Sequence, residues 1–336
     1  MGAIAGTRLT VVMPTRDRRE RASRTLARLG EELAGHPAEA IVVDDGSSDG
    51  SAVAIAGLAA SFPVPLRVER LETSRGPGAA RNRGLQLAAG SICLFLGDDI
   101  VPRPGLVARH LDFHRHRPDR ADALLGRVVP APPLDRSPFV CWLHEQGKQY
   151  AYGLLESGAQ VQARFFYAAN SSLKLELLRS AGGFDERFHF GHEEAELAGR
   201  LQTAGLRLHY DAEAVAEHDH PTDLVATLRR MREFGRSQRL LTELDRSQPG
   251  PGRPSARHRL AAVALALPAL VGLRPAPVRA RTWRFLCEQA SREAFWGERD
   301  PSDPALRVGR SLARLAARDP ATRLTPNQGR GRGAPA

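Results

Sequence analysis

The first hundred residues alternate between short, continuously apolar runs and longer stretches in which apolar residues recur every three or four positions. Continuous apolar runs are typical of strands buried on both faces, and the longer spacing is typical of amphipathic helices. The pattern predicts strands over residues 9–14, 40–45, 65–71 and 91–99. It predicts helices over residues 19–33, 51–62 and 77–90. We therefore expect an α/β fold with a Rossmann-like, mainly parallel sheet flanked by helices.

The later part of the chain has a different pattern. The stretch that ends near Phe165 is less regular, and clustered prolines in residues 127–139 favour an extended loop there. Three further helices are predicted, over residues 173–184, 193–206 and 223–244. Residues 245–259 have the composition of a linker. This pattern divides the chain into a domain over 1–225, a helical C-terminal extension over 226–324 and a disordered tail over 325–336.

Composition and charge narrow the class of protein only partly. The 336 residues are 42% hydrophobic and 26% charged, as in an ordinary globular protein. The formal net charge is +10, and almost all of the positive charge is arginine, because Lys148 and Lys174 are the only lysines. Arginine favours forked contacts with phosphate and carboxylate groups. The charge is therefore compatible with a nucleotide, a membrane surface or a nucleic acid as partner.

The cysteines and the apolar segments bear on the cellular location. Cys93, Cys141 and Cys287 are scattered, which indicates a reducing compartment rather than a disulfide framework. No basic start followed by a long apolar segment appears at the N-terminus, so we predict no signal peptide. Residues 260–273 are apolar but too short to span a bilayer, which leaves a buried helix or an interfacial helix. We predict a cytoplasmic protein.

Two pairs of adjacent carboxylates follow predicted strands. Asp44 and Asp45 end the second strand, and Asp98 and Asp99 end the fourth. Ligands of parallel sheets bind beyond the carboxyl ends of the strands, so we expect both pairs to face one crevice. Adjacent carboxylates repel each other, and a divalent cation would compensate for the repulsion. The alternative is that both pairs only cap turns and helices.

Three further features each have a structural and a functional interpretation. The glycine-rich helix start at residues 75–84 can approach phosphates closely, or it is simply a basic solvated helix. Carboxylates at a helix N-terminus, such as Glu193 and Glu194, are favoured by the helix dipole, but one of them could serve as a general base. His218 and His220 are either surface residues or ligands. The helically spaced pair His110 and His114 is predicted to be solvated.

Six segments, taken in chain order, resemble successive motifs of the family 2 glycosyltransferases: VVMPTRDR, VVDDGSSDGS, RGPGAARNRGL, FLGDDIVP, NSSLKLELLRSAGGFDERF and GHEEAELAGRL. The resemblance covers about residues 8–222, and the ordered set is far more specific than any single motif. It implies a GT-A fold, with domain 1–225 as the nucleotide-sugar-binding and catalytic domain. It also implies a nucleotide-sugar donor, a divalent metal (Mg or Mn) and inversion at the transferred sugar.

The resemblance assigns donor-binding roles to particular residues. In the family, the positions that hold the donor's base and ribose are matched by Pro14, Thr15, Asp44 and Asp45. Arg81 matches an arginine in an Ala-Arg-Asn turn near the diphosphate.

The resemblance also assigns metal-binding and catalytic roles, with two departures from the family pattern. Asp99 matches the family's usual metal ligand, whereas the first aspartate of the Asp-x-Asp motif is Gly97 here, and Asp98 is expected to replace part of the lost ribose or secondary metal contact. Glu193 and Glu194 match a Glu-Asp pair in which the second residue is the usual base, so Glu194 is the expected base. His218 or His220 matches a region where relatives place a histidine near the metal.

Partners and alternative functions follow from the same residues. The acceptor is a glycan, a lipid-linked molecule or a small molecule, which the sequence does not distinguish. The basic C-terminal part suggests a peripheral contact with the inner face of the plasma membrane. The first alternative is a non-catalytic relative that binds a nucleotide or glycan, motivated by Gly97 and Glu194. A nucleic-acid-binding protein is disfavoured, because aromatic content is 6% and no recognition motif appears.

Overall fold

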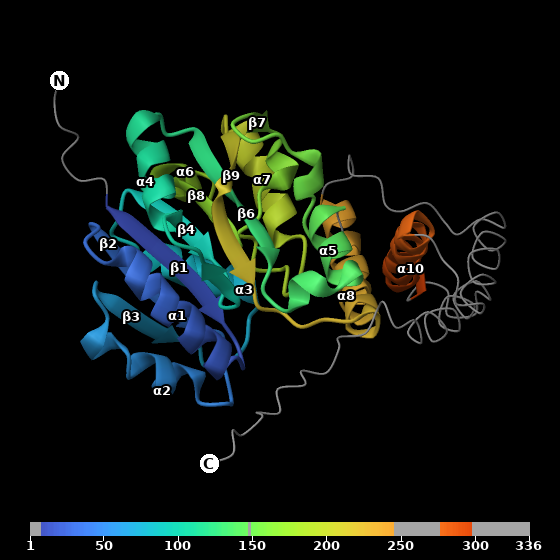
Figure 1. The fold of residues 1–336 in the computed structure, drawn as a ribbon, viewed down its shortest axis with the longest axis horizontal. Helices are drawn as coiled ribbons and strands as arrows, with labels where there is room; N and C mark the ends of the chain where they lie inside the picture. Colours follow the sequence, from blue (N-terminus) through green and yellow to red (C-terminus); the bar gives the residue numbers. More distant parts are fainter. Residues whose placement is uncertain (1–7, 147–148, 245–275, 298–336) are drawn as a thin grey trace, which may run out of the picture.

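The computed structural model describes residues 8–146, 149–244 and 276–297. Within these residues a single mixed sheet forms the centre of the molecule, with strand order β3-β2-β1-β4-β8-β6-β9-β5 and with β7 beside β9 (Figure 1). The strands are β1 (Leu9–Thr15), β2 (Ala38–Asp44), β3 (Leu66–Arg70), β4 (Ile92–Leu96), β5 (Ile100–Pro102), β6 (Asp122–Pro130), β7 (Gln160–Val161), β8 (Asn170–Lys174) and β9 (Arg207–His218). The helices are α1 (Arg19–Leu33), α2 (Ser51–Ala56), α3 (Pro77–Leu87), α4 (Leu106–His116), α5 (Pro138–Glu145), α6 (Leu175–Ser180), α7 (Glu193–Thr203), α8 (Leu224–Leu244) and α10 (Ala276–Gly297).

The N-terminal half of the sheet confirms the alternation predicted from the sequence. β3, β2, β1 and β4 are parallel neighbours, so their carboxyl ends meet at one edge. The side chains of β1, β2 and β4 are mostly fully buried, as continuous apolar runs require, whereas those of β3 are partly or fully exposed. Helix α3 packs closely on β1, because a Cβ atom at Gly84 would lie only 2.4 Å from the Val12 side chain.

The other half of the sheet differs from the sequence prediction. β8 is antiparallel to both β4 and β6, and β5 and β7 are antiparallel to β9, so among the described strands of this half only β6 and β9 form a parallel pair. Residues 127–130 belong to β6 rather than to an extended loop, and residues 173–174 end β8 rather than begin a helix. β8 lacks an apolar run, since it starts with Asn170, Ser171 and Ser172. The long strand β9 was not predicted, and an irregularity in its pairing with β6 interrupts its regular pattern.

The prediction that His110 and His114 are solvated is wrong. Both side chains lie on the inward face of α4 and are buried. The Nδ1 atom of His110 is 2.7 Å from the Ser172 hydroxyl, and its Nε2 atom is 2.9 Å from the Asn170 side-chain oxygen. The His114 Nε2 atom is 2.8 Å from the same serine hydroxyl. The two histidines therefore provide hydrogen-bond partners for Asn170 and Ser172, two buried polar side chains of β8. The helical spacing of the histidines alone could not indicate these partners.

A second hydrophobic core joins the C-terminal helices to the rest of the molecule. It is built from α5, α8 and α10, which lie together on one side of the sheet (Figure 1). Its large members include Phe139, Trp142, Leu228, Met231, Trp283 and Leu286. The described helices include none with the length and hydrophobicity that a membrane span needs. The apolar segment 260–273, the linker and the tail lie outside the described residues.

Candidate active site

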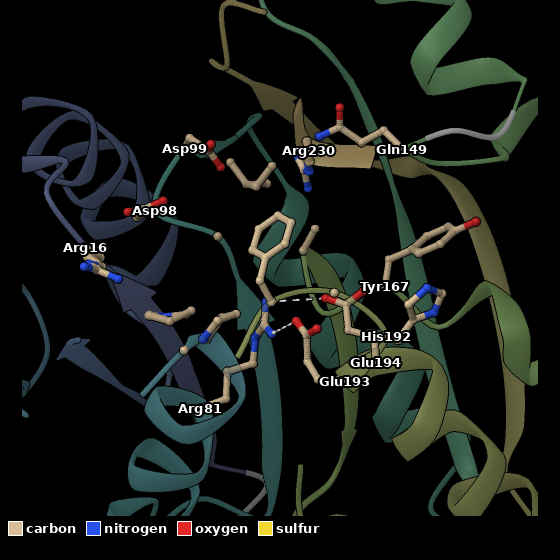
Figure 2. A pocket seen from close by; sticks show the side chains of 18 of the residues that line it. Arg16, Arg81, Asp98, Asp99, Gln149, Tyr167, His192, Glu193, Glu194 and Arg230 are labelled. Atoms are coloured by element: carbon tan, nitrogen blue, oxygen red, sulfur yellow. Dashed lines mark hydrogen bonds and ion pairs between the residues drawn. The ribbon is translucent and has the colours of Figure 1, made fainter. Parts of the chain in front are cut away.

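A cavity of about 580 Å³ opens beyond the carboxyl ends of the parallel strands (Figure 2). Its walls come from the ends of β1 and β4, the start of α3, the start of α7 and one side of α8. All of the site residues predicted from the sequence line this cavity except Asp44 and His220. His220 lies next to the cavity against Asp99, whereas Asp44 is fully buried behind it.

Asp98 and Asp99, which we call the strand-end pair, share one arginine. A single nitrogen of Arg18, Nη1, donates to the Asp98 Oδ1 atom at 2.9 Å and to the Asp99 Oδ2 atom at 2.5 Å. The Thr15 hydroxyl donates to Asp98 at 2.8 Å. Burial raises the pKa of Asp98, and the charge of Asp99 adds to this effect.

Asp99 also faces two histidines. Its Oδ2 atom is 3.1 Å from the Nδ1 atom of His220 and 3.5 Å from the Nε2 atom of His218. Burial opposes the charged form, but the histidines and Arg18 together hold the pKa of Asp99 well below its usual range. The adjacent carboxylates of the strand-end pair are thus compensated by cationic and imidazole groups of the chain itself.

The same three residues form a potential metal site. One ligand atom each from Asp99, His218 and His220 lies within 4.8 Å of the others. A carboxylate with two imidazoles suits a transition ion such as Mn²⁺ better than Mg²⁺, which prefers oxygen ligands and water. The side chain of His144 on α5 supports this group, with its Nε2 atom 3.1 Å from the Nδ1 atom of His218. The residues present therefore fit a divalent metal.

Glu193 and Glu194, which we call the helix-start pair, begin α7. His192 precedes them with a left-handed backbone (φ 65°), which turns the chain into the helix. Arg81 from α3 reaches both glutamates, with Nη1 at 3.2 Å from Glu193 and Nη2 at 3.4 Å from Glu194 (Figure 2). Burial raises the pKa of Glu194 to about 7; Arg81 opposes the shift, and the charge of Glu193 adds to it.

Asp44 and Asp45, the other acidic pair noted in the sequence, have different structural roles. Asp44 accepts a hydrogen bond from the backbone N–H of Ser47 at 2.6 Å and does not line the cavity. Asp45 lines the cavity and accepts from the backbone N–H groups of Arg75 at 2.7 Å and Gly76 at 2.9 Å. Asp45 therefore holds the loop that leads into α3.

That loop is also fixed from its other side. Gly76 has a positive φ of 93°, and a Cβ atom there would lie 2.4 Å from the backbone oxygen of His189. Only glycine allows the start of α3 to approach the segment before α7 this closely. This contact brings the arginine of α3 within reach of the helix-start pair.

Several lining residues were not singled out from the sequence. Arg18 lies inside the VVMPTRDR segment, but nothing in the pattern indicated that it pairs with the strand-end pair. Tyr150 and Tyr167 come from the segments that flank β7, and Arg230 and Phe234 come from α8. The predicted domain boundary at residue 225 thus falls at the start of α8, the helix that contributes Arg230 and Phe234 to the cavity.

Comparison with known proteins agrees with this geometry. Residues 10–134 match the family model described as Glycosyl transferase family 2. An uncharacterized glycosyltransferase of Bacillus subtilis, YfnE, is 25% identical over 260 residues, which cover 64% of this chain and 65% of the relative. The pre-mycofactocin glycosyltransferase of Mycobacterium tuberculosis is 30% identical over 233 residues, which cover 68% of this chain and 46% of the relative. The chain thus matches less than two thirds of the length of these curated relatives.

A solved structure supports the fold. The mannosyltransferase PcManGT from Pyrobaculum calidifontis, in complex with GDP-Man and Mn²⁺, superposes with a TM-score of 0.61 at 20% identity. The superposition covers 88% of this chain and 89% of the mannosyltransferase. The architecture is a GT-A fold, a mixed sheet flanked by helices with a helical C-terminal part. The chain belongs to the family 2 glycosyltransferases.

Proposed function

We propose that the chain is a metal-dependent, inverting glycosyltransferase that moves a sugar from a nucleoside-diphosphate sugar to an acceptor hydroxyl. One observation carries the proposal. A single cavity is bordered by a carboxylate–imidazole group at the strand ends and contains a carboxyl group with a pKa of about 7 at the start of α7. The first suits a divalent metal beside a diphosphate, and the second suits a general base.

Glu194 is the proposed base. A pKa of about 7 leaves a substantial ionised fraction at neutral pH and makes that form a competent proton acceptor. Glu194 takes the proton of the acceptor hydroxyl while the oxygen forms a bond to the anomeric carbon. The bond from that carbon to the diphosphate breaks, and its electron pair leaves with the diphosphate. A single displacement from the opposite face inverts the anomeric configuration.

Asp99, His218 and His220 are the residues that would hold the metal. When bound, a divalent ion supplies positive charge to the departing diphosphate. Arg18 orients Asp99 and Asp98 by contacting both. The complex of the structural relative with GDP-Man and Mn²⁺ supports this assignment.

The residues expected to bind the donor differ in their position relative to the cavity. Pro14, Thr15 and Asp45 line the cavity and are candidates to contact the base and ribose. Asp44 lies behind them, so its contribution would be to hold the turn at Ser47. Arg81 contacts both glutamates of the helix-start pair, so its charge lies beside Glu194, the proposed general base. These contacts compete with the role that we expected for Arg81 at the diphosphate.

The test is a turnover assay on the full chain with UDP-, GDP- and dTDP-sugars. We expect release of one nucleoside diphosphate with Mn²⁺ and its loss with a chelator. The anomeric configuration of the transferred sugar, read by NMR, tests inversion. Nucleotide binding without hydrolysis or transfer for any donor would instead favour the non-catalytic relative. Retention of configuration would contradict the single displacement by Glu194.

A further inference from the structure

The charges that line the cavity are mostly paired. Arg18 is paired with the strand-end pair, and Arg81 is paired with the helix-start pair. Arg16 donates to the hydroxyl of Ser74 at 2.6 Å. Arg164 is an exposed residue at the rim, stacked over Phe165. The remaining arginine of the lining, Arg230, has a different environment.

Arg230 projects from α8 and is partly buried. Its guanidinium carbon lies 5.5 Å from the centre of the Phe190 ring and 5.8 Å from the centre of the Phe234 ring. The two rings contact each other edge to face. In the part of the chain that the structure describes, no carboxylate pairs with this guanidinium. Aromatic rings hold a cation in position without neutralising its charge.

The charge of Arg230 acts on the reacting part of the cavity. Burial raises the pKa of Glu194, and Arg230 is one of the groups that oppose this shift. The same charge opposes the burial-driven rise in the pKa of Tyr150, whose ring lies 6.0 Å from the ring of His218. Figure 2 shows Arg230 beside Gln149, in the lining of the cavity that also contains Glu194. The Arg230 guanidinium is thus close enough to act on Glu194, the proposed base, and on Tyr150, which neighbours His218 of the proposed metal site.

We propose that Arg230 is an anion-binding residue of this site and holds a phosphate group of a substrate. This inference rests on the proposed function. A partly desolvated guanidinium without a carboxylate partner is favourable when an anion completes its hydrogen bonds, and its planar fork matches phosphate oxygens. Arg230 lies outside residues 10–134, so the family match does not assign it. The phosphate can belong to the donor diphosphate or to a phosphorylated acceptor.

The first arm of the experiment tests the donor diphosphate. GDP, UDP, pyrophosphate and the parent nucleosides are titrated with Mn²⁺ into the wild-type chain, Arg230→Gln and Arg230→Lys. Arg229→Gln is the matched control, because Arg229 is the exposed neighbour on α8 and does not line the cavity. A donor contact predicts an affinity loss of about ten-fold or more for the diphosphates in Arg230→Gln. The loss is smaller in Arg230→Lys and absent for nucleosides and for the control.

The second arm tests a phosphorylated acceptor. Octyl phosphate and octyl glucoside are titrated in the presence of saturating nucleotide. An acceptor contact predicts weaker binding of octyl phosphate alone in Arg230→Gln, with nucleotide affinity unchanged. The proposal is overturned if a folded Arg230→Gln binds nucleotides, pyrophosphate and octyl phosphate as the wild type does, or if the wild type binds none of them. Failure of sugar transfer with these binding differences intact would count only against the proposed function.

Discussion

The strand-end pair and the helix-start pair are two sets of adjacent carboxylates in one cavity, each contacted by an arginine. At the strand ends, Arg18 is joined by two histidines, and the pKa of Asp99 is held well below its usual range despite burial. At the start of α7, Arg81 contacts both glutamates and no histidine joins it in the described residues, and burial raises the pKa of Glu194 to about 7. The cationic and imidazole partners around Asp99 therefore favour its charged form, whereas Glu194 titrates near neutral pH.

This difference corresponds to two kinds of chemistry. A carboxylate that stays ionised is a ligand for a cation, and a carboxyl group that titrates near neutral pH can exchange a proton. Substitutions in either pair, or of the arginine beside one of them, test this difference.

The largest effect is expected for Glu194→Gln. Glutamine keeps the shape but cannot accept the proton, so the transfer rate should fall about a thousand-fold with nucleotide affinity nearly unchanged. Steady-state kinetics and calorimetric titration measure the two quantities. Glu196→Gln is the control, because Glu196 lies on the same helix but pairs with Arg200 outside the cavity. A full transfer rate in Glu194→Gln would remove Glu194 as the base.

Asp99→Asn should break the other pair. The amide loses the charge that would bind a divalent ion, so Mn²⁺-dependent affinity for the nucleoside diphosphate should fall about ten- to a hundred-fold. The affinity in chelator should stay at the wild-type value. Asp112→Asn, at an exposed position on α4, should leave both affinities unchanged. If the Mn²⁺ dependence survived in Asp99→Asn, the metal would have to be bound elsewhere.

Arg81→Gln removes the arginine that contacts both glutamates of the helix-start pair. Arg81 lowers the pKa of Glu194, so its loss should raise that pKa further. Because the ionised form is the active base, the acidic limb of the kcat/KM profile should move to higher pH, with a several-fold rate loss at pH 6.5. Arg83→Gln on the same helix, paired with Glu69, is the control. An unmoved limb would mean that the profile reports another group.

The smallest effect concerns His110, a fully buried group whose pKa is set mainly by burial, against the smaller opposing effects of Asn170 and Asp211. Burial lowers its pKa to about 4, below the value of an unfolded histidine. Between those values the unfolded chain binds more protons, so the free energy of unfolding should fall as pH drops from about 6.5 towards 4. The loss from this residue should be about 1 kcal/mol at pH 5.5. Urea unfolding of wild type and His110→Asn at pH 7.5 and 5.5 should show a smaller acid loss in the variant; an equal loss would contradict the assignment.

The four predicted aspartates, Pro14 and Thr15 came together because they end or follow β1, β2 and β4, which belong to one parallel unit. The ends of β1 and β4 meet at one edge, which places Thr15 beside Asp98. The partners that set the charge states were not predictable in the same way. Arg18 and Arg230 occur among many arginines, and no pattern distinguishes those that turn inward. The central strand β8 was likewise not predicted, because it begins with polar residues. Their burial is possible because histidines of α4 form hydrogen bonds with Asn170 and Ser172.

The alternating α/β half, the resemblance to the family and the carboxylates at strand and helix ends were predictable from the sequence. These features depend on local periodicity and on residue types at fixed positions, which are read along the chain. The tertiary structure alone decided which charges meet. Arg81 reaches the glutamates because α3 packs against the segment before α7, and α8 joins the cavity because a separate core holds it against α5 and α10. A pKa depends on burial and on neighbours within a few ångströms, and those neighbours are distant in the sequence.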